Sequence, residues 1–301
     1  MKMRSFLSFI LILLFCLNTQ PIFAEETPTH HELSEFEEPL VAPAFIKPET
    51  AEVPVIMYHL VTKNGRYIGK YGISPTELEN DLKYLKENGY ETVVMADLIA
   101  FVRRGKNLPK KPVVLTFDDG NSGDYRYLYP LLQKYDMKAV VSVIGSAADE
   151  CTAIAAKQTS PAVFPNSTWP ELKEMSESGF IELQNHSYDL HGARGSGRRS
   201  GEPMDAYQKR LKEDLEKMQN LTHEMTGAKL NTFTYPLGIV SDGSEAVLKE
   251  IGFVSSLSCG EGMNYLEENN PDCLFRLKRV NRPSGVTASM ILQKLEKDAK
   301  D

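Results

Sequence analysis

Two adjacent carboxylates at the end of an apolar run are the first residues of this sequence that could do chemistry. Asp118 and Asp119 follow the run 112–117 and precede Gly120. A continuous apolar run bounded by proline and glycine is typical of a buried strand, and the carboxyl ends of such strands line the ligand crevice of α/β folds. Two neighbouring carboxylates there need a metal, a proton or a cation to balance their charge. A strand followed by an ordinary turn is the alternative.

Two histidines follow a second predicted strand. His186 comes directly after the strand predicted at 181–185, and His191 follows five residues later in a turn. With an aspartate from the first strand, they make an Asp/His/His ligand set for a divalent metal. Three protein ligands leave coordination positions open for water, which is typical of a catalytic site. A third stretch, YPLG at 235–238, is again a strand end that runs into proline and glycine.

Strands and helices alternate along the rest of the chain and must position these residues. Ser74, Pro75 and Glu77 have the pattern of a helix N-terminus with a capping box. Strands are predicted at 53–58, 92–95, 112–117, 139–144, 181–185, 232–235, 253–257 and 275–280, and helices at 75–88, 96–104, 124–135, from 168 onward, 204–225, 243–250 and 287–298. This alternation predicts one α/β domain at 53–301 with a parallel sheet, either closed into a barrel or doubly wound.

The N-terminus has the composition of a secretory signal. Lys2 and Arg4 precede an apolar run at 6–17, which is short for a bilayer span, and Ala24 offers a cleavage site. We predict a signal peptide at 1–24 and a secreted or extracellular chain, with an uncleaved signal that tethers it to the membrane as the alternative. Residues 25–52 are rich in Glu, Pro and Thr and predict a disordered linker.

Charge and cysteine content limit the class of partner. The formal net charge is −7, and removal of the two basic residues in 1–24 makes it −9. An acidic chain without a basic face is not expected to bind nucleic acid. After the signal, cysteines remain at 151, 259 and 273; Cys259 and Cys273 could form a disulfide, but the spacing is not that of a zinc site. The sequence shows no sign of an obligate protein partner.

Three motifs, in this order, resemble those of the polysaccharide deacetylase (NodB-homology) family. They are TFDDG at 116–120, HSYDLH at 186–191 and FTYPLG at 233–238. The first two together are specific, whereas the third alone is an ordinary strand end. The segment PVIMYH at 54–59 resembles the branch that includes poly-N-acetylglucosamine deacetylases. The resemblance covers about residues 53–281 and implies a distorted (β/α) barrel and metal-dependent hydrolysis of N-acetyl groups on glycans.

The resemblance also implies roles for individual residues. Asp119, His186 and His191 would hold the metal, with zinc as the default and nickel, cobalt or iron as alternatives. Asp118 would be the general base, because the charge of its neighbour is already neutralised by the metal.

The third motif and a basic loop are the candidates for substrate binding. The backbone N–H of Leu237 is expected to stabilise the oxyanion, and Tyr235 and Pro236 are expected to contact the substrate. The glycine-rich loop 192–201 carries three arginines. Arg194 is a candidate for binding an anionic group of a polymer, and a solvated mobile loop is the alternative.

The sequence departs from the family pattern in three places. The two histidines are five residues apart, whereas many members space them four apart. Thr234 stands where the third motif often has an arginine that orients the base. No histidine follows His223, although a late motif usually supplies the acid that protonates the leaving amine. We predict that His59, at the end of the first strand, supplies this acid; a missing acid would make turnover slow.

The predicted function is removal of N-acetyl groups from a polysaccharide that contains N-acetylglucosamine, either an exopolysaccharide or peptidoglycan, at the cell surface or wall. The first alternative is a glycan O-acetyl esterase, because an alkoxide leaving group depends less on a strong acid. The second is a catalytically weak glycan-binding wall protein. The absent arginine and late histidine favour the second alternative, and the intact metal ligands and free base oppose it.

Overall fold

The computed structural model describes residues 49–157 and 165–299. The signal peptide predicted at 1–24 and most of the linker predicted at 25–52 lie outside the described residues. The predicted end of the linker is too late, because Thr50–Val53 already form strand β1, which pairs antiparallel with β11 (Asn264–Glu267). In the described ranges, no helix combines the length and the apolar character needed to cross a bilayer.

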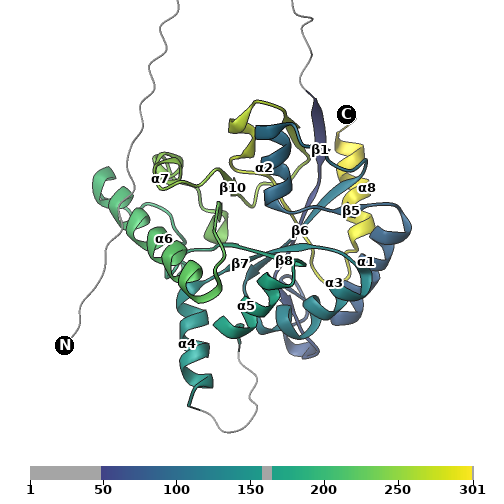
Figure 1. Cartoon of the computed structure of the whole chain (residues 1–301), viewed down its shortest axis with the longest axis horizontal. Helices are drawn as coiled ribbons and strands as arrows, with labels where there is room; N and C mark the ends of the chain where they lie inside the picture. The colour runs from purple at the N-terminus through teal and green to yellow at the C-terminus, as the bar shows by residue number, and fades with distance from the viewer. Residues whose placement is uncertain (1–48, 158–164, 300–301) are drawn as a thin grey trace, which may run out of the picture. The chain divides into compact units, whose positions relative to one another are not determined.

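A curled sheet of eight parallel strands forms the centre of the domain (Figure 1). Seven of its strands are hydrogen-bonded in the order β10 (Ser255–Leu257), β9 (Thr232–Thr234), β8 (Ile181–Asn185), β7 (Ala139–Val143), β6 (Pro112–Asp119), β2 (Val55–Tyr58) and β12 (Val280–Asn281). The eighth, β5 (Glu91–Thr92), pairs with the start of β6, and β3 (Leu60–Val61) and β4 (Gly72–Ile73) form a separate small sheet. Parallel strands joined through helices confirm the predicted α/β class.

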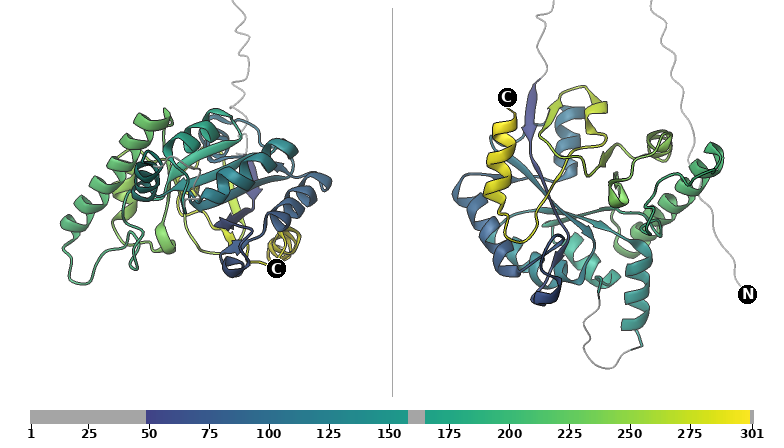
Figure 2. Two further views of the ribbon diagram at one scale, coloured as in Figure 1. Left: turned by 90° about the horizontal axis from the view of Figure 1, so that it is seen from below. Right: turned by 180° about the vertical axis from the view of Figure 1, so that it is seen from behind.

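Helices cover the outside of this sheet (Figures 1 and 2). The α-helices are α1 (Pro75–Glu87), α2 (Met95–Arg104), α3 (Tyr129–Tyr135), α4 (Gly145–Ala155), α5 (Trp169–Glu177), α6 (Met204–Thr226), α7 (Ser244–Glu250) and α8 (Ala288–Asp298). Short 3-10 helices lie at Gly65–Tyr67, Pro236–Gly238 and Pro271–Leu274, and a π-helix at Asp124–Leu128 precedes α3. The long α6 lies on one flank, and α1 and α8 pack together on the other.

Helix N-termini are the features that the sequence predicts best. At the start of α1, the Ser74 hydroxyl accepts a hydrogen bond from the Glu77 N–H, and the Glu77 carboxylate accepts one from the Ser74 N–H. At the start of α5, the Glu171 carboxylate likewise accepts a hydrogen bond from the Thr168 N–H, and the Thr168 hydroxyl donates to the same oxygen. The sequence does not predict α4, because its first turn is made of glycine, serine and alanine and has no capping side chain.

The segment 276–281 links the two ends of the sheet. Leu277 forms a parallel bridge with Leu257 on β10, and β12, a few residues later, pairs with β2. The sheet is therefore curled into the distorted barrel that the family resemblance implies and is not an open doubly wound sheet. The strand predicted at 275–280 is wrong in extent. This segment bridges β10 only at Leu277 and becomes a regular strand, β12, only at 280–281, where it pairs with β2. The sequence also does not predict β11.

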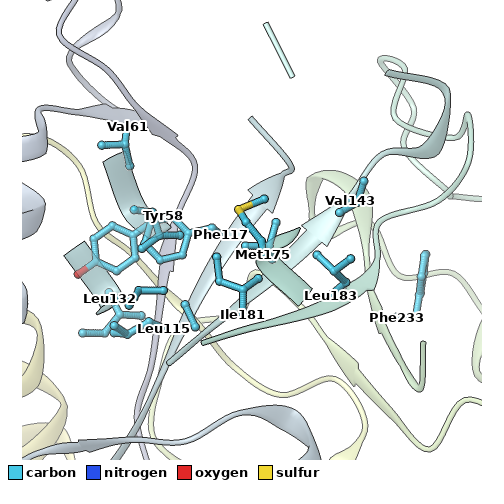
Figure 3. Close-up of a cluster of buried hydrophobic side chains, with 14 of the residues drawn as sticks. Tyr58, Val61, Leu115, Phe117, Leu132, Val143, Met175, Ile181, Leu183 and Phe233 are labelled. Atoms are coloured by element: carbon cyan, nitrogen blue, oxygen red, sulfur yellow. The ribbon is translucent and has the colours of Figure 1, made fainter. Parts of the chain in front are cut away.

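Side chains alternate between the two faces of β6. Leu115 and Phe117 belong to the larger core beneath the helices, where the Phe117 ring stacks on Tyr58 with 4.7 Å between centroids (Figure 3). Val114 faces the other way, into a second apolar cluster. Each large side chain buried in this way stabilises the fold by ~1.5–3 kcal/mol. The same period of two places Asp118 on the face of Val114.

A buried ion pair holds the end of the chain against α1. The Arg282 Nε donates to Asp81 Oδ2 over 2.6 Å, and the same carboxylate accepts hydrogen bonds from the Tyr58 hydroxyl and the Ala288 N–H. A buried carboxylate with three donors is well compensated for its desolvation. The contact anchors the residues that directly follow β12 and so supports the segment that links the sheet.

Candidate active site

The carboxyl ends of three parallel strands of the sheet, β6, β8 and β9, border a cavity of ≈ 610 Å³. Parallel strands end at the same edge of a sheet, so residues distant in sequence meet there. β6 ends in the two aspartates, β8 leads into the two histidines, and β9 leads into the Pro236–Gly238 turn. The lining includes the predicted metal ligands Asp119, His186 and His191 and the predicted catalytic residues Asp118, His59 and Leu237.

Asp119, His186 and His191 direct ligand atoms at one point. Asp119 Oδ1 lies 3.5 Å from His186 Nε2 and 3.2 Å from His191 Nε2, and the three ligand atoms lie within 4.8 Å of one another. Asp119 Oδ1 is buried without a hydrogen-bond partner. The His186 Nδ1 faces the Thr234 carbonyl oxygen at 2.8 Å, so its proton belongs on Nδ1 and the Nε2 lone pair is free. This donor set fits a divalent cation.

The charges of these three residues are coupled. Burial alone would raise the pKa of the Asp119 carboxyl, but the two histidines outweigh it and lower the pKa below its usual value. In turn, the hydrogen bond with Asp119 raises the pKa of His191 more than burial lowers it. A proton held between Asp119 and a histidine competes with a metal ion for the same ligand atoms. Metal binding is therefore expected to weaken as the pH falls.

Left-handed backbone conformations end the strands at the cavity. Asp119, Ser187 and Leu237 have φ values of 77°, 71° and 57°. Residues other than glycine rarely adopt this region, and such strain is found most often at functional sites. Adjacent residues of a strand normally point to opposite faces. The turn at Asp119 interrupts the extended backbone, and both Asp118 and Asp119 line the same cavity.

The loop between the two histidines is held by hydrogen bonds from two other elements. The Ser187 N–H donates to Asn185 Oδ1 over 2.8 Å, which closes the turn directly after β8. On α6, the two carboxylate oxygens of Asp214 accept the Tyr188 and Asp189 N–H groups at 2.8 and 2.9 Å. On a regular helix, residues five apart would point to different sides. The turn at Ser187 instead brings the His191 ring to 4.8 Å from the His186 ring.

Asp118 is oriented by an arginine that the sequence analysis does not identify. Arg279 is fully buried and donates from Nη1 and Nη2 to the two carboxylate oxygens of Asp118, over 2.7 and 2.9 Å. Burial would raise the pKa of Asp118, but the Arg279 charge outweighs it and lowers the pKa. Thr234, which stands where the family motif often has an arginine, bonds to Ser142 instead. Arg279 orients Asp118 in place of that arginine.

A weak sequence signal for Arg279 does exist. Phe275, Leu277 and Arg279 alternate along the chain, so a strand here puts the arginine on the same face as two apolar residues. A charged residue at a core-facing position is rarely buried unless it is paired. Its partner Asp118 lies 161 residues away, and no local pattern indicates that pairing.

His59, the predicted proton donor, lines the cavity beside Asp118. Its Nε2 is 4.0 Å from Asp118 Oδ2, its ring packs at 4.9 Å from the Tyr71 ring, and its buried Nδ1 has no hydrogen-bond partner. Burial lowers the pKa of His59, although Asp118 opposes this effect. The imidazole is therefore favoured in its neutral form before the reaction.

The predicted substrate contacts of the third motif need correction. The Tyr235 ring is buried and its hydroxyl bonds to that of Ser244, and Pro236 is buried as well, so neither side chain lines the cavity. They hold the turn that presents Leu237, whose side chain is 52% exposed. The Leu237 N–H makes no hydrogen bond with the described residues, so it can donate to a substrate.

Arg194 is exposed and does not line the cavity. Its loop is nevertheless not a freely solvated segment, because Ser196 and Gly197 are buried and Arg210 donates to the Gly197 carbonyl. Contact of Arg194 with substrate therefore requires a polymer that extends beyond the cavity.

The structure decides the cysteine pairing that the sequence leaves open. Cys259 and Cys273 are both free thiols in the described part of the chain. Cys259 lines the cavity near Arg279, whereas Cys273 does not line it.

Comparison with known proteins shows the family and the fold. The family model for polysaccharide deacetylase matches residues 105–255, half of the chain. A Staphylococcus aureus poly-β-1,6-N-acetyl-D-glucosamine N-deacetylase is 25% identical over 273 residues, which are 87% of this chain and 88% of that protein. An Escherichia coli protein of the same name is 27% identical over 233 residues, 70% of this chain but only 34% of the longer relative. A de-N-acetylase structure from Aggregatibacter actinomycetemcomitans superposes with a TM-score of 0.66 at 24% identity, covering 81% of this chain and 99% of that one.

Asp214 provides a test of how the metal ligands are held. We expect Asp214→Asn to weaken Zn²⁺ binding by about 10–100-fold, because the amide cannot accept both backbone N–H groups and outer-sphere partners of metal ligands contribute on this scale. Isothermal titration calorimetry on the apo protein measures the affinity.

Glu213→Gln is the matched control for this experiment, since Glu213 neighbours Asp214 on α6 but, within residues 49–157 and 165–299, pairs only with the exposed Lys209. Equal Zn²⁺ affinity in the two variants and the unmodified chain would show that Asp214 does not position the ligands.

Proposed function

Since the chain belongs to the polysaccharide deacetylase family, we propose that this hydrolase removes N-acetyl groups from a polymer of N-acetylglucosamine. The observation that carries the proposal is the carboxylate of Asp118, which is not one of the three metal-ligand candidates. Arg279 holds it beside the separate Asp/His/His set. Two relatives that match most of this chain are named poly-β-1,6-N-acetyl-D-glucosamine N-deacetylases, which makes a β-1,6-linked polymer the first substrate to test.

The chemistry of the ligand set supports a metal-dependent reaction. Asp119, His186 and His191 would hold the ion, and zinc suits two imidazoles and one carboxylate; nickel, cobalt and iron accept the same donors. A bound divalent cation would activate the attacking water and polarise the acetyl carbonyl.

The remaining residues of the cavity have separate tasks. Asp118 accepts a proton from the attacking water, because its carboxylate is ionised and is not one of the three ligands. The Leu237 N–H donates a hydrogen bond to the oxygen that becomes negative as the carbonyl is attacked. A backbone donor held by a buried turn needs little reorganisation for this task.

His59 delivers the proton that the leaving nitrogen needs. It is neutral at rest because burial lowers its pKa, so it must gain a proton during the reaction. Protonated Asp118 is the stronger acid and its Oδ2 lies 4.0 Å from His59 Nε2. The proton taken from water can therefore pass through His59 to the amine.

The two alternative functions differ in what supports them. The argument for a glycan-binding protein without turnover rested on a missing arginine and a missing late histidine. Arg279 and His59 occupy the corresponding places beside Asp118, which removes that argument. An O-acetyl esterase uses the same groups, and the choice of substrate in the assay separates it from the amidase.

We also propose that the chain acts outside the cytoplasm, at the cell surface or wall. The signal-like composition of residues 1–24 and the linker composition that follows support export, either as a secreted protein or tethered through an uncleaved signal. A polymeric substrate outside the cell is consistent with this location, and the acidic net charge disfavours nucleic acid as a partner.

The first test is acetate release from N-acetylglucosamine oligomers by the Zn²⁺-loaded chain. We expect the unmodified chain to release acetate from β-1,6 oligomers. In Asp118→Asn the rate of release should fall at least about a hundredfold, because a general base contributes on this scale. Asp205→Asn, an exposed carboxylate on α6, is the matched control and should retain activity. No release from β-1,6 or β-1,4 oligomers with any of the four metals would overturn the proposal.

Arg279→Lys should change the pH dependence. Arg279 lowers the pKa of Asp118, so its replacement by a group that cannot bond to both oxygens lets burial raise that pKa. The reaction needs ionised Asp118 and is lost as the pH falls through its pKa; the acidic limb of log kcat/KM against pH should therefore move to higher pH. Arg276→Lys, an exposed arginine of the same segment, should leave the limb in place. An unchanged limb in Arg279→Lys would mean that Asp118 is not the group that titrates.

His59→Ala should separate the amide from the ester reaction. An amine leaves only with a proton, so we expect kcat on N-acetylglucosamine oligomers to fall by about 10²–10⁴-fold. The rate on an O-acetylated glycan should fall less, because its leaving alkoxide depends less on an acid. His223→Ala on the exposed side of α6 is the control. A near-unchanged amide rate in His59→Ala would exclude His59 as the proton donor.

A further inference from the structure

Two sulfur atoms lie side by side in the wall of the catalytic cavity. Cys259 Sγ is 3.9 Å from Met57 Sδ, and both residues line the cavity. Neither sulfur belongs to the Asp/His/His ligand set, and the proposed reaction uses neither. Met57 is 5% exposed, so the pair is reached through the cavity and not from the outer surface.

The backbone around this pair holds both donors in place. Met57 precedes His59 by two residues, so both side chains leave the strand on the same face. On the other side, a Cβ atom built on Gly238 would lie only 2.6 Å from Cys259 Cβ, which shows how closely the turn after β9 packs against the cysteine. Donors fixed in this way lose little freedom when they bind an ion.

We propose that Cys259 and Met57 form a binding site for a soft monovalent cation, Cu⁺ or Ag⁺, beside the catalytic base. Thiolate and thioether sulfurs are the ligands that select such ions, whereas the carboxylate and imidazoles of the metal site suit harder divalent ions. Two metal–sulfur bonds of ~2.3 Å that span this pair enclose an angle of about 115°, near that of a trigonal site.

Binding exchanges a proton for the metal ion. The Cys259 S–H bond breaks, the sulfur–metal bond forms, and the proton goes to solvent; no oxidant or reductant is required. Burial raises the pKa of the Cys259 thiol, so the thiol is protonated before the ion arrives. The bound pair of thiolate and monovalent cation is neutral, and the nearby charge of Arg279, 3.8 Å from Sγ, is already balanced by Asp118.

A third donor lines the same cavity as this pair. The buried Nδ1 of His59 has no hydrogen-bond partner, and His59 lines the same cavity. An ion that recruits this nitrogen would withdraw His59 from proton delivery. Even without it, an ion on Cys259 adds bulk next to Arg279 in the cavity wall. Occupation of the site should therefore inhibit deacetylation, and this consequence rests on the proposed function.

Titration of the full-length Zn²⁺-loaded chain with Ag⁺ in chloride-free buffer tests the site. Ultraviolet absorbance of the silver–thiolate bond counts the ions bound, and a pH indicator in weak buffer counts the protons released. We expect Cys259→Ser to lose one equivalent of tightly bound Ag⁺ and one released proton. Met57→Leu keeps the thiol but should bind this ion at least about tenfold more weakly, as expected for loss of a ligand.

Cys273→Ser is the matched control, because Cys273 is also a partly buried free thiol but lies away from the cavity. It should retain both the tight equivalent and the basal rate. An unchanged number of tight ions in Cys259→Ser would overturn the site. Equal affinity in Met57→Leu and the unmodified chain would overturn the two-sulfur arrangement.

The rate of acetate release tests whether the bound ion inhibits the reaction. The rate of each variant with Ag⁺ is compared with the rate of the same variant without Ag⁺. One equivalent of Ag⁺ should abolish release by the unmodified chain and spare Cys259→Ser, with the Zn²⁺ content unchanged. Loss of Zn²⁺ together with activity would overturn inhibition through Cys259. Absence of release before Ag⁺ is added would contradict the proposed function alone, since the binding arm does not depend on turnover.

Discussion

The buried ion pair between Arg279 and Asp118 is the interaction on which the rest of the site depends. A lone carboxylate at this depth would be protonated, and a lone guanidinium there would be strongly destabilising. The pair exists only because the segment 276–281 contacts β10 at one end and β2 at the other. Curling of the sheet and ionisation of the base are thus two consequences of the same short segment.

A second constraint is the convergence of parallel strand ends. β6, β8 and β9 run parallel in one sheet, with β7 between β6 and β8, so their carboxyl ends bring the aspartates, the histidines and the Leu237 turn to one cavity. Each of these strands ends in a left-handed residue or leads into one, and that strain is held by buried hydrogen bonds. The Thr234 carbonyl on β9 accepts a hydrogen bond from His186 Nδ1 and so sets the tautomer of a residue on the adjacent strand.

Helices contribute to the site from outside the sheet. Asp214 on α6 accepts two backbone N–H groups of the loop between the histidines. Asp149 on α4 bonds to the Tyr188 hydroxyl of that loop and to the indole N–H of Trp169 on α5. These carboxylates touch none of the three predicted ligands. They hold the loop that carries the ligands, which explains how a glycine-rich stretch can follow His191 without loosening it.

The sequence by itself determined the class of fold, the capped helices and the residues that could bind a metal, because these depend on local period, capping and residue type. It also led to the prediction that His59 lines the site and replaces a missing acid, and the structure places His59 in the cavity. Only the tertiary structure decided that Arg279 supports Asp118, that Tyr235 faces the core, that Cys259 and Cys273 remain apart, and that α4 forms. Each of these depends on which distant segments meet. Pairing across 161 residues leaves no periodic trace in the chain, since the contact is set by the curvature of the sheet and not by neighbours in sequence.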